Sequence, residues 1–134
     1  MADVIRAPEL APPSGYSHGV RARGALLAVA GQVAWDAEGR IVGQDFVTQF
    51  SAALQNVVAV VRAAGGDAAD LIALTIFVTN KSAYLACLRP LGLAYRAVMG
   101  RHYPAMTLVE VKGLIEPGAL VEIQGLAVLP ERAR

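Results

Sequence analysis

The sequence has very little cysteine: Cys87 is the one thiol among 134 residues, so the chain cannot form an internal disulfide. A chain without disulfides is typical of a reducing compartment, and we expect a cytoplasmic protein. Long apolar runs are missing as well. Residues 1–15 hold no apolar stretch of signal-peptide length, and the most apolar segments elsewhere are too short to span a bilayer. We therefore expect no membrane partner.

An excess of one charge is also lacking, because 12 Lys and Arg residues offset 11 Asp and Glu residues and leave a net charge of +1. Without a basic patch the chain has no field that attracts nucleic acid, so no nucleic-acid partner is expected. His18, His102 and Cys87 do not have the spacing of a metal site, and the glycines form no phosphate-binding loop. We expect neither a metal nor another cofactor.

Apolar residues are abundant: 55% of the chain is hydrophobic and 17% is charged. The length of 134 residues predicts a single domain over 1–134. Pro8, Pro12 and Pro13 predict an extended N-terminal arm over 1–14. A chain this short cannot bury so much apolar surface within itself, so an oligomer is expected.

Hydrophobic periodicity predicts the order β-β-α-β-α-β-β, an α+β fold in which two helices cover one face of a mixed sheet. The expected strands cover 16–20, 26–33, 71–79, 106–111 and 119–129. The first two strands are expected to turn around Arg23-Gly24, and strand 71–79 is expected to be covered on both faces. The open face of the sheet would need a partner subunit.

The first helix is the clearest element, because its apolar residues recur at spacings of three and four: Phe46, Phe50, Leu54, Val57 and Val61. Asp45 is its expected N-terminal cap, and Gly65-Gly66 is expected to end it. The second helix is expected over 83–99. Pro90 lies inside it and predicts a kink or two shorter helices.

The last predicted strand carries two polar residues among apolar ones. Strand alternation places Glu122 and Gln124 on one face, between Leu120 and Leu126. A carboxylate in apolar surroundings needs a partner or must be able to take up a proton, and the second property suits a general acid or base. Glu122 is therefore the candidate catalytic residue. The alternative is a structural glutamate, bonded to a backbone amide or an arginine, or facing solvent.

Several short motifs occur in one order along nearly the whole chain: Tyr16-Ser17-His18, Gly31-Gln32, Gln49 and Asn56 in the first helix, Thr75 to Thr79, Tyr103-Pro104-Ala105, and Gly118 to Ile123. In this order they resemble the Rid family of imine/enamine deaminases, also called the YjgF or L-PSP family. The resemblance implies a chorismate-mutase-like fold, a homotrimer, and a metal-free cleft for a small molecule at each subunit interface. It also implies that Glu122 is catalytic and that five residues bind substrate: Tyr16, Ala30, Gly31, Ala105 and Met106.

The chain departs from the family pattern at the position where archetypal deaminases hold the substrate carboxylate with an arginine. Here this residue is Met106, while Ala30 and Gly92 replace a hydroxyl residue and an asparagine. Methionine cannot form the charged pair, whose loss costs roughly 2 to 5 kcal/mol. A small 2-imino acid is therefore not the expected substrate unless another cation binds it. The candidate cations are Arg21, Arg101 and Lys112.

Three other residues have both a functional and a structural interpretation, and a fourth, Cys87, has a structural one. Tyr16 is a site phenol or an interface aromatic, and Trp35 is a lid or a packed anchor. Glu110 either shares a face with the cleft or is solvated or ion-paired. Cys87 is expected to be a buried, unreactive thiol.

Three functions remain open at this point. The first is hydrolysis of an enamine or imine other than a small 2-imino acid, such as an aminated dienoate or amino-aromatic breakdown product, with water activated by Glu122. The second is a non-enzymatic trimer that binds or senses a small molecule, which the loss of the arginine favours. The third is a ribonuclease, for which the chain lacks a basic patch, a stacking platform and a catalytic histidine pair.

Overall fold

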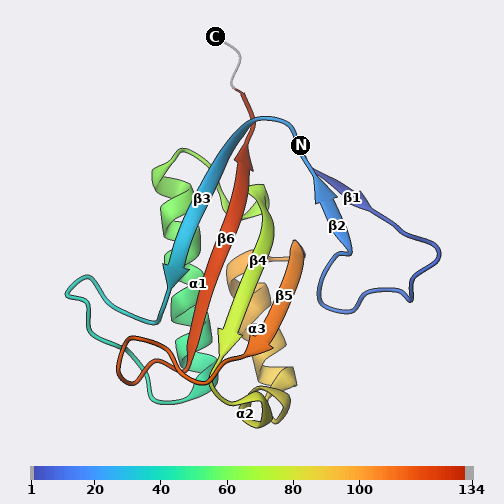
Figure 1. Cartoon of the computed structure of the whole chain (residues 1–134). Helices are drawn as coiled ribbons and strands as arrows, with labels where there is room; N and C mark the ends of the chain where they lie inside the picture. Colours follow the sequence, from blue (N-terminus) through green and yellow to red (C-terminus); the bar gives the residue numbers. More distant parts are fainter. Residues whose placement is uncertain (1, 132–134) are drawn as a thin grey trace.

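A computed structural model describes residues 2–131, so the first residue of the predicted arm lies outside the described part, as do residues 132–134. Within these residues ten elements follow one another: β1 (Asp3–Ile5), β2 (Gly19–Arg21), β3 (Ala25–Gln32), α1 (Phe46–Ala63), the 3-10 helix η1 (Ala68–Asp70), β4 (Leu71–Val78), α2 (Lys81–Leu85), α3 (Leu88–Met99), β5 (Ala105–Glu110) and β6 (Val121–Leu129). The predicted α+β class is confirmed (Figure 1). No helix within residues 2–131 is long and apolar enough to cross a membrane.

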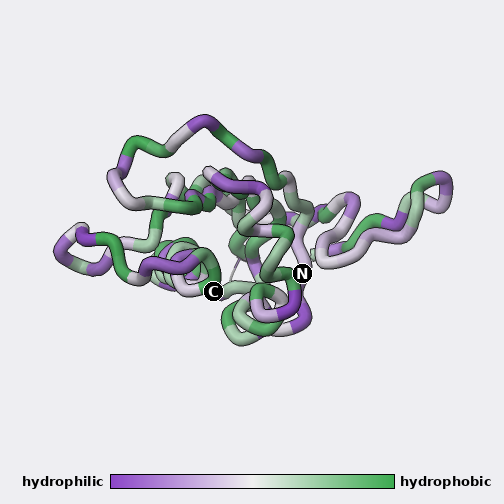
Figure 2. The backbone as a smooth tube through the Cα atoms, turned by 90° about the horizontal axis from the view of Figure 1, so that it is seen from below, coloured by the Kyte–Doolittle hydropathy of each residue, from purple (hydrophilic) through white to green (hydrophobic). Residues whose placement is uncertain are grey.

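The main sheet has four strands in the order β3-β6-β4-β5. β6 pairs antiparallel with both of its neighbours, and β4 pairs parallel with β5, so the sheet is mixed as predicted. Both long helices, α1 and α3, lie on one side of it (Figures 1 and 2). The other side, here called the open face, carries half-buried or exposed apolar residues: Leu26, Ala28, Phe77, Val109 and Leu126.

β4 is less covered than its sequence predicted. Leu74, Ile76 and Val78 are buried against the helices, whereas Thr75 and Phe77 point to the open face and are half-buried. The run of consecutive apolar residues therefore does not indicate burial on both faces within one chain. It indicates a strand whose second face is apolar and uncovered.

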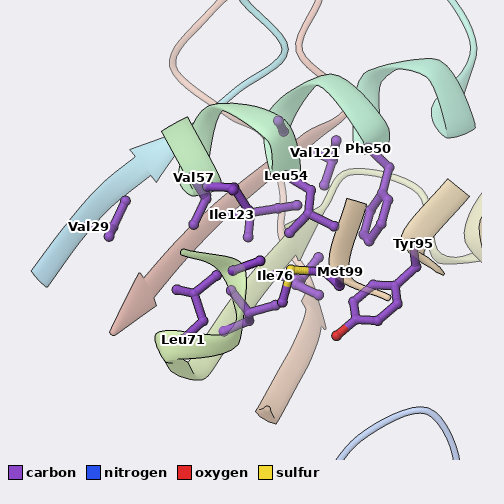
Figure 3. Packing of buried hydrophobic residues seen from close by; sticks show 14 of the residues in the cluster. Val29, Phe50, Leu54, Val57, Leu71, Ile76, Tyr95, Met99, Val121 and Ile123 are labelled. Carbon is purple, nitrogen blue, oxygen red and sulfur yellow. The ribbon is translucent and has the colours of Figure 1, made fainter. Parts of the chain in front are cut away.

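The core forms where α1 packs against the sheet. Its predicted stripe is confirmed, because each of these side chains is at most 8% exposed: Phe46, Phe50, Leu54, Val57 and Val61. They pack with buried residues of β4, β6 and α3, among them Leu71, Ile123 and Tyr95 (Figure 3). This packing fixes the position of the sheet, and the residues of the open face project from its other side.

The helix boundaries follow local chemistry. The Asp45 carboxylate accepts a hydrogen bond from the Thr48 amide at 3.0 Å, as the predicted cap requires. The predicted second helix is two helices, and Asn80 caps the first by accepting from the Ala83 amide at 3.0 Å. Pro90 lies in the first turn of α3, where its missing amide hydrogen leaves no helical bond unmade.

The N-terminal region differs from the prediction. The strands expected at 16–20 and 26–33 do not form a hairpin: β2 pairs with β1, inside the predicted arm, and β3 pairs with β6. Gly24 explains the difference, because a Cβ there would lie 2.0 Å from the Leu129 carbonyl oxygen. The chain passes tightly against the end of β6 at this point instead of turning back, and the β1–β2 arm extends from the body in both views (Figures 1 and 2).

Candidate functional site

Glu122 lies on the open face of β6, as the alternation predicted, with Val121 and Ile123 buried on the helix side. Its half-buried side chain passes directly over Gly31 of β3. A Cβ at Gly31 would come within 2.2 Å of the Glu122 Oε2 atom. Within residues 2–131 this carboxylate forms no hydrogen bond or ion pair. The structure therefore presents an acceptor that is available to a ligand or to water.

The backbone of β3 is irregular beside Glu122. Val29 pairs with Gly125 of β6, but the next pair is Gln32 with Ile123, so β3 has one extra residue in the interval. Ala30 and Gly31 form this bulge. A bulge bends its strand and leaves backbone groups without ladder partners, and bulges are frequent next to active sites. Three predicted site residues, Glu122, Ala30 and Gly31, are thus brought together.

Two other predicted site residues lie in a groove on the helix side, here called the α3 groove, with a volume of about 960 Å³. Its walls are the arm segment 13–16, helices α2 and α3, and strand β5. Met106 and Leu108 line it from β5, and Tyr16, 38% exposed, lines it from the arm. Ser17 fixes this part of the arm, since its amide donates to the Pro104 oxygen at 3.1 Å.

These two groups of residues lie on opposite faces of the sheet. Met106 is in register with the buried Leu74 of β4, whereas Glu122 is in register with Phe77, three residues further along the same strand. β4 also lies between the strands that carry them. Ala105 is half-buried and, by alternation, faces away from Met106. Within one chain, Glu122 and Met106 therefore do not share a site.

Three residues considered in the sequence analysis form hydrogen bonds within the fold: Glu110, Cys87 and Trp35. The Glu110 carboxylate accepts from the Lys81 amide at 2.7 Å, which places it at the start of α2. The Cys87 thiol is half-buried rather than buried as expected; it donates to the Ala83 oxygen at 3.2 Å, and desolvation raises its pKa. The Trp35 indole N–H donates to the Gln32 Oε1 atom at 3.1 Å.

The histidines also bond to the backbone. The Nε2 atom of His18 is 2.8 Å from the Ala11 oxygen, and that of His102 is 2.6 Å from the Leu71 oxygen. The Tyr95 hydroxyl donates to the His102 oxygen at 2.6 Å, and burial raises the pKa of Tyr95. In the described part of the chain, no three His, Cys, Asp or Glu side chains are grouped so that they could hold a metal ion.

Comparison with known proteins accounts for the order of the short motifs along the chain. A protein-family model described as Endoribonuclease L-PSP matches residues 6–129. The chain belongs to the Rid family, also called YjgF or L-PSP. A RutC family protein of Pyrococcus horikoshii is 31% identical over 129 residues, which cover 95% of this chain and 98% of that protein.

Two further members of the Rid family are similar to the chain. A protein of Salmonella typhimurium named 2-iminobutanoate/2-iminopropanoate deaminase is 31% identical over 108 residues, or 78% of this chain and 80% of the relative. The solved structure of a Yersinia pestis member, described as a protein of unknown function, superposes with a TM-score of 0.85 at 35% identity. It covers 96% of this chain and 98% of that one.

One charged residue of the α3 groove was not predicted from the sequence. Arg96 lines it from α3, one helical turn after Gly92. The cations named from the sequence are elsewhere: Arg21 is 3.5 Å from Asp3 on the arm, and Arg101 and Lys112 are exposed and do not line the groove. The i, i+4 spacing from Gly92, a position already singled out, is the signal that points to Arg96.

Proposed function

We propose that this protein is a hydrolytic deaminase of an enamine or imine, and that Glu122 activates the attacking water without a metal. The observation that carries the proposal is the Glu122 carboxylate, half-buried on the open face, passing over Gly31 and free of partners within residues 2–131. A carboxylate held this way can accept a proton from water. Similarity to a relative named as an imine deaminase gives further support.

The site is proposed to form between subunits of a homotrimer. Glu122 and the α3 groove lie on opposite faces of the sheet, so one chain cannot bring them to the same ligand. A second copy that covers the open face can bring its own groove to Glu122. The exposed Leu26 and Leu126 of the open face support such an assembly, since it would remove them from water.

The proposed reaction needs only a carboxylate and a water molecule. The water oxygen bonds to the C=N carbon as Glu122 takes one proton from the water and the C=N π bond breaks. Glu122 passes this proton to the nitrogen, which gives a carbinolamine and regenerates the carboxylate. The C–N bond then breaks, the hydroxyl proton passes through Glu122 to the leaving nitrogen, and ammonia and a carbonyl compound are released. In the alternative, the protein is a non-enzymatic binder whose groove holds a small molecule, and none of these steps takes place.

The α3 groove supports a substrate that is larger or less polar than a small 2-imino acid. The side chains of Met106 and Leu108 line the groove and are apolar, so neither can form an ion pair with a substrate carboxylate. The groove volume of about 960 Å³ suits a ligand with a bulky body. Ribonuclease activity, named in the description of the family model, has less support. The chain carries a net charge of +1, and the Nε2 atoms of both histidines lie within hydrogen-bond distance of backbone oxygens.

The test is hydrolysis of 2-imino acids that an amino-acid oxidase generates in situ, followed by trapping the remaining imine with semicarbazide. We expect faster hydrolysis of the phenylalanine-derived imine and slow or no acceleration for the alanine-derived imine. Met106→Arg is expected to raise activity on the alanine-derived imine, because a guanidinium can bind its carboxylate. Rapid turnover of that imine by the unmodified protein would show that the substrate assignment is wrong.

A further inference from the structure

One charged side chain stands out in the α3 groove. Among the described residues that line it, Arg96 alone carries a full charge at neutral pH. The others are apolar, small or hydroxyl-bearing. Two of the apolar ones, Phe50 and Ile76, are each 3% exposed and belong to the core. The groove thus combines an apolar interior with one cation on its wall.

The position of Arg96 depends on Gly92, one helical turn earlier. The Nη1 atom of Arg96 lies 3.6 Å from the place where a Gly92 Cβ would be. The guanidinium therefore lies back along α3, over a residue that has no side chain to displace it. Arg96 is exposed, and it forms no ion pair with any residue from 2 to 131. Its hydrogen-bond donors are available to an anion.

The groove also offers flat apolar surfaces. The rings of Tyr95 and Tyr103 are stacked, with centroids 5.2 Å apart and planes 12° apart, and both line the groove. Tyr84 and Met106 line it as well. Aromatic and thioether groups favour an apolar or aromatic ligand body, whereas guanidinium matches the two oxygens of a carboxylate.

We propose that Arg96 binds the carboxylate of an aromatic or other bulky apolar acid held in the α3 groove. Arg96 then determines specificity. From α3 it supplies the anion contact that Met106 of β5 cannot make, and the apolar body of the ligand occupies the space next to Met106. The inference deepens the proposed deaminase function, whose substrate would be the imine of such an acid. Binding itself does not require the reaction to occur.

Calorimetric titration with three probes tests this inference: phenylpyruvate, its neutral analogue phenylacetone, and the small acid pyruvate. The unmodified protein should bind phenylpyruvate at least about tenfold more tightly than either of the others. Arg96→Gln should weaken phenylpyruvate binding by about the same factor and leave phenylacetone binding unchanged. Arg89→Gln is the matched control, because Arg89 is exposed on the same helix and does not line the groove.

A second variant tests the location. Gly92→Leu should fill the groove and abolish binding of phenylpyruvate, while circular dichroism shows an intact fold. Unchanged binding in Arg96→Gln or in Gly92→Leu would overturn the inference, and so would a lack of phenylpyruvate binding to the unmodified protein. If binding depends on Arg96 but the protein hydrolyses no imine, the inference stands and the deaminase proposal fails.

Discussion

At the scale of single residues, the contact between Gly31 and Glu122 decides how the carboxylate is held. No other residue type fits at position 31 without moving Glu122, since a Cβ would be 2.2 Å from Oε2 and 2.9 Å from the carboxyl carbon. The atoms that clash belong to the end of a flexible side chain. The carboxylate would therefore swing away while the fold remains.

Gly31→Ala is expected to reduce imine turnover by about tenfold or more, because it displaces the proposed general base, while the unfolding midpoint changes little. Gly113→Ala is the control, since a Cβ there has no heavy atom within 4 Å. Steady-state kinetics and urea unfolding of both variants measure the two effects. Equal turnover in Gly31→Ala and the unmodified protein would show that this contact does not position a catalytic group.

The strand period was enough to predict the face on which Glu122 lies, because a period of two needs no tertiary information. The role of Arg96 could not be predicted in the same way. Its place in the same groove as Met106 depends on how the core arranges α3 relative to β5, and the local sequence does not determine this arrangement.

At the scale of elements, Gln49 connects α1 to the two loops that precede α1 and β6. It is a 1% exposed polar residue whose amide nitrogen donates to the oxygens of Gly43 and Gly118 at 3.1 and 3.0 Å. Its Oε1 atom accepts from the Leu120 amide at 2.8 Å. Leu120 lies two residues before Glu122, so this side chain helps to set where the last strand begins.

Gln49→Met should lower the free energy of unfolding by about 2 to 3 kcal/mol, because buried backbone groups lose their partners while side-chain volume is kept. Gln55→Met is the matched control: Gln55 is exposed on the same helix, and we expect a change within about 0.5 kcal/mol. Urea denaturation followed by circular dichroism measures both. Equal stability of the two variants would show that the buried network adds nothing.

Caps, apolar stripes and the division of the second helix near Pro90 were predictable because each depends on neighbours within one or two turns. The pairing of β2 was not. The turn expected at Arg23-Gly24 had the right residue types, but the close approach of Gly24 to Leu129 is a contact between residues more than a hundred positions apart. Sequence patterns of turns do not contain such contacts.

At the scale of the whole molecule, the open face is the main uncovered apolar surface of the sheet. Leu26 is 70% exposed, Val109 is 40% exposed and Leu126 is 39% exposed. The apolar composition predicted that a partner is needed. It could not predict that the uncovered face would be the one bearing Glu122, because this depends on the helices occupying the other side (Figure 2).

We expect light scattering at micromolar concentration to give the mass of a trimer, three times 14.0 kDa or about 42 kDa. Leu126→Glu should give folded monomers, since it places a charge in the proposed interface without disturbing the core. It should also lose imine hydrolysis if the site lies between subunits. A monomeric mass for the unmodified protein would contradict the proposed assembly and the shared site.

The substitution Glu122→Gln tests the account most directly, because it removes the proton acceptor and keeps nearly the same shape. Imine hydrolysis is measured together with the light-scattering mass and the phenylpyruvate affinity. We predict a loss of turnover of about a hundredfold or more, with the mass and the affinity unchanged. Unchanged turnover on an imine that the unmodified protein hydrolyses would contradict a catalytic role for Glu122, and loss of the trimer would make the residue structural.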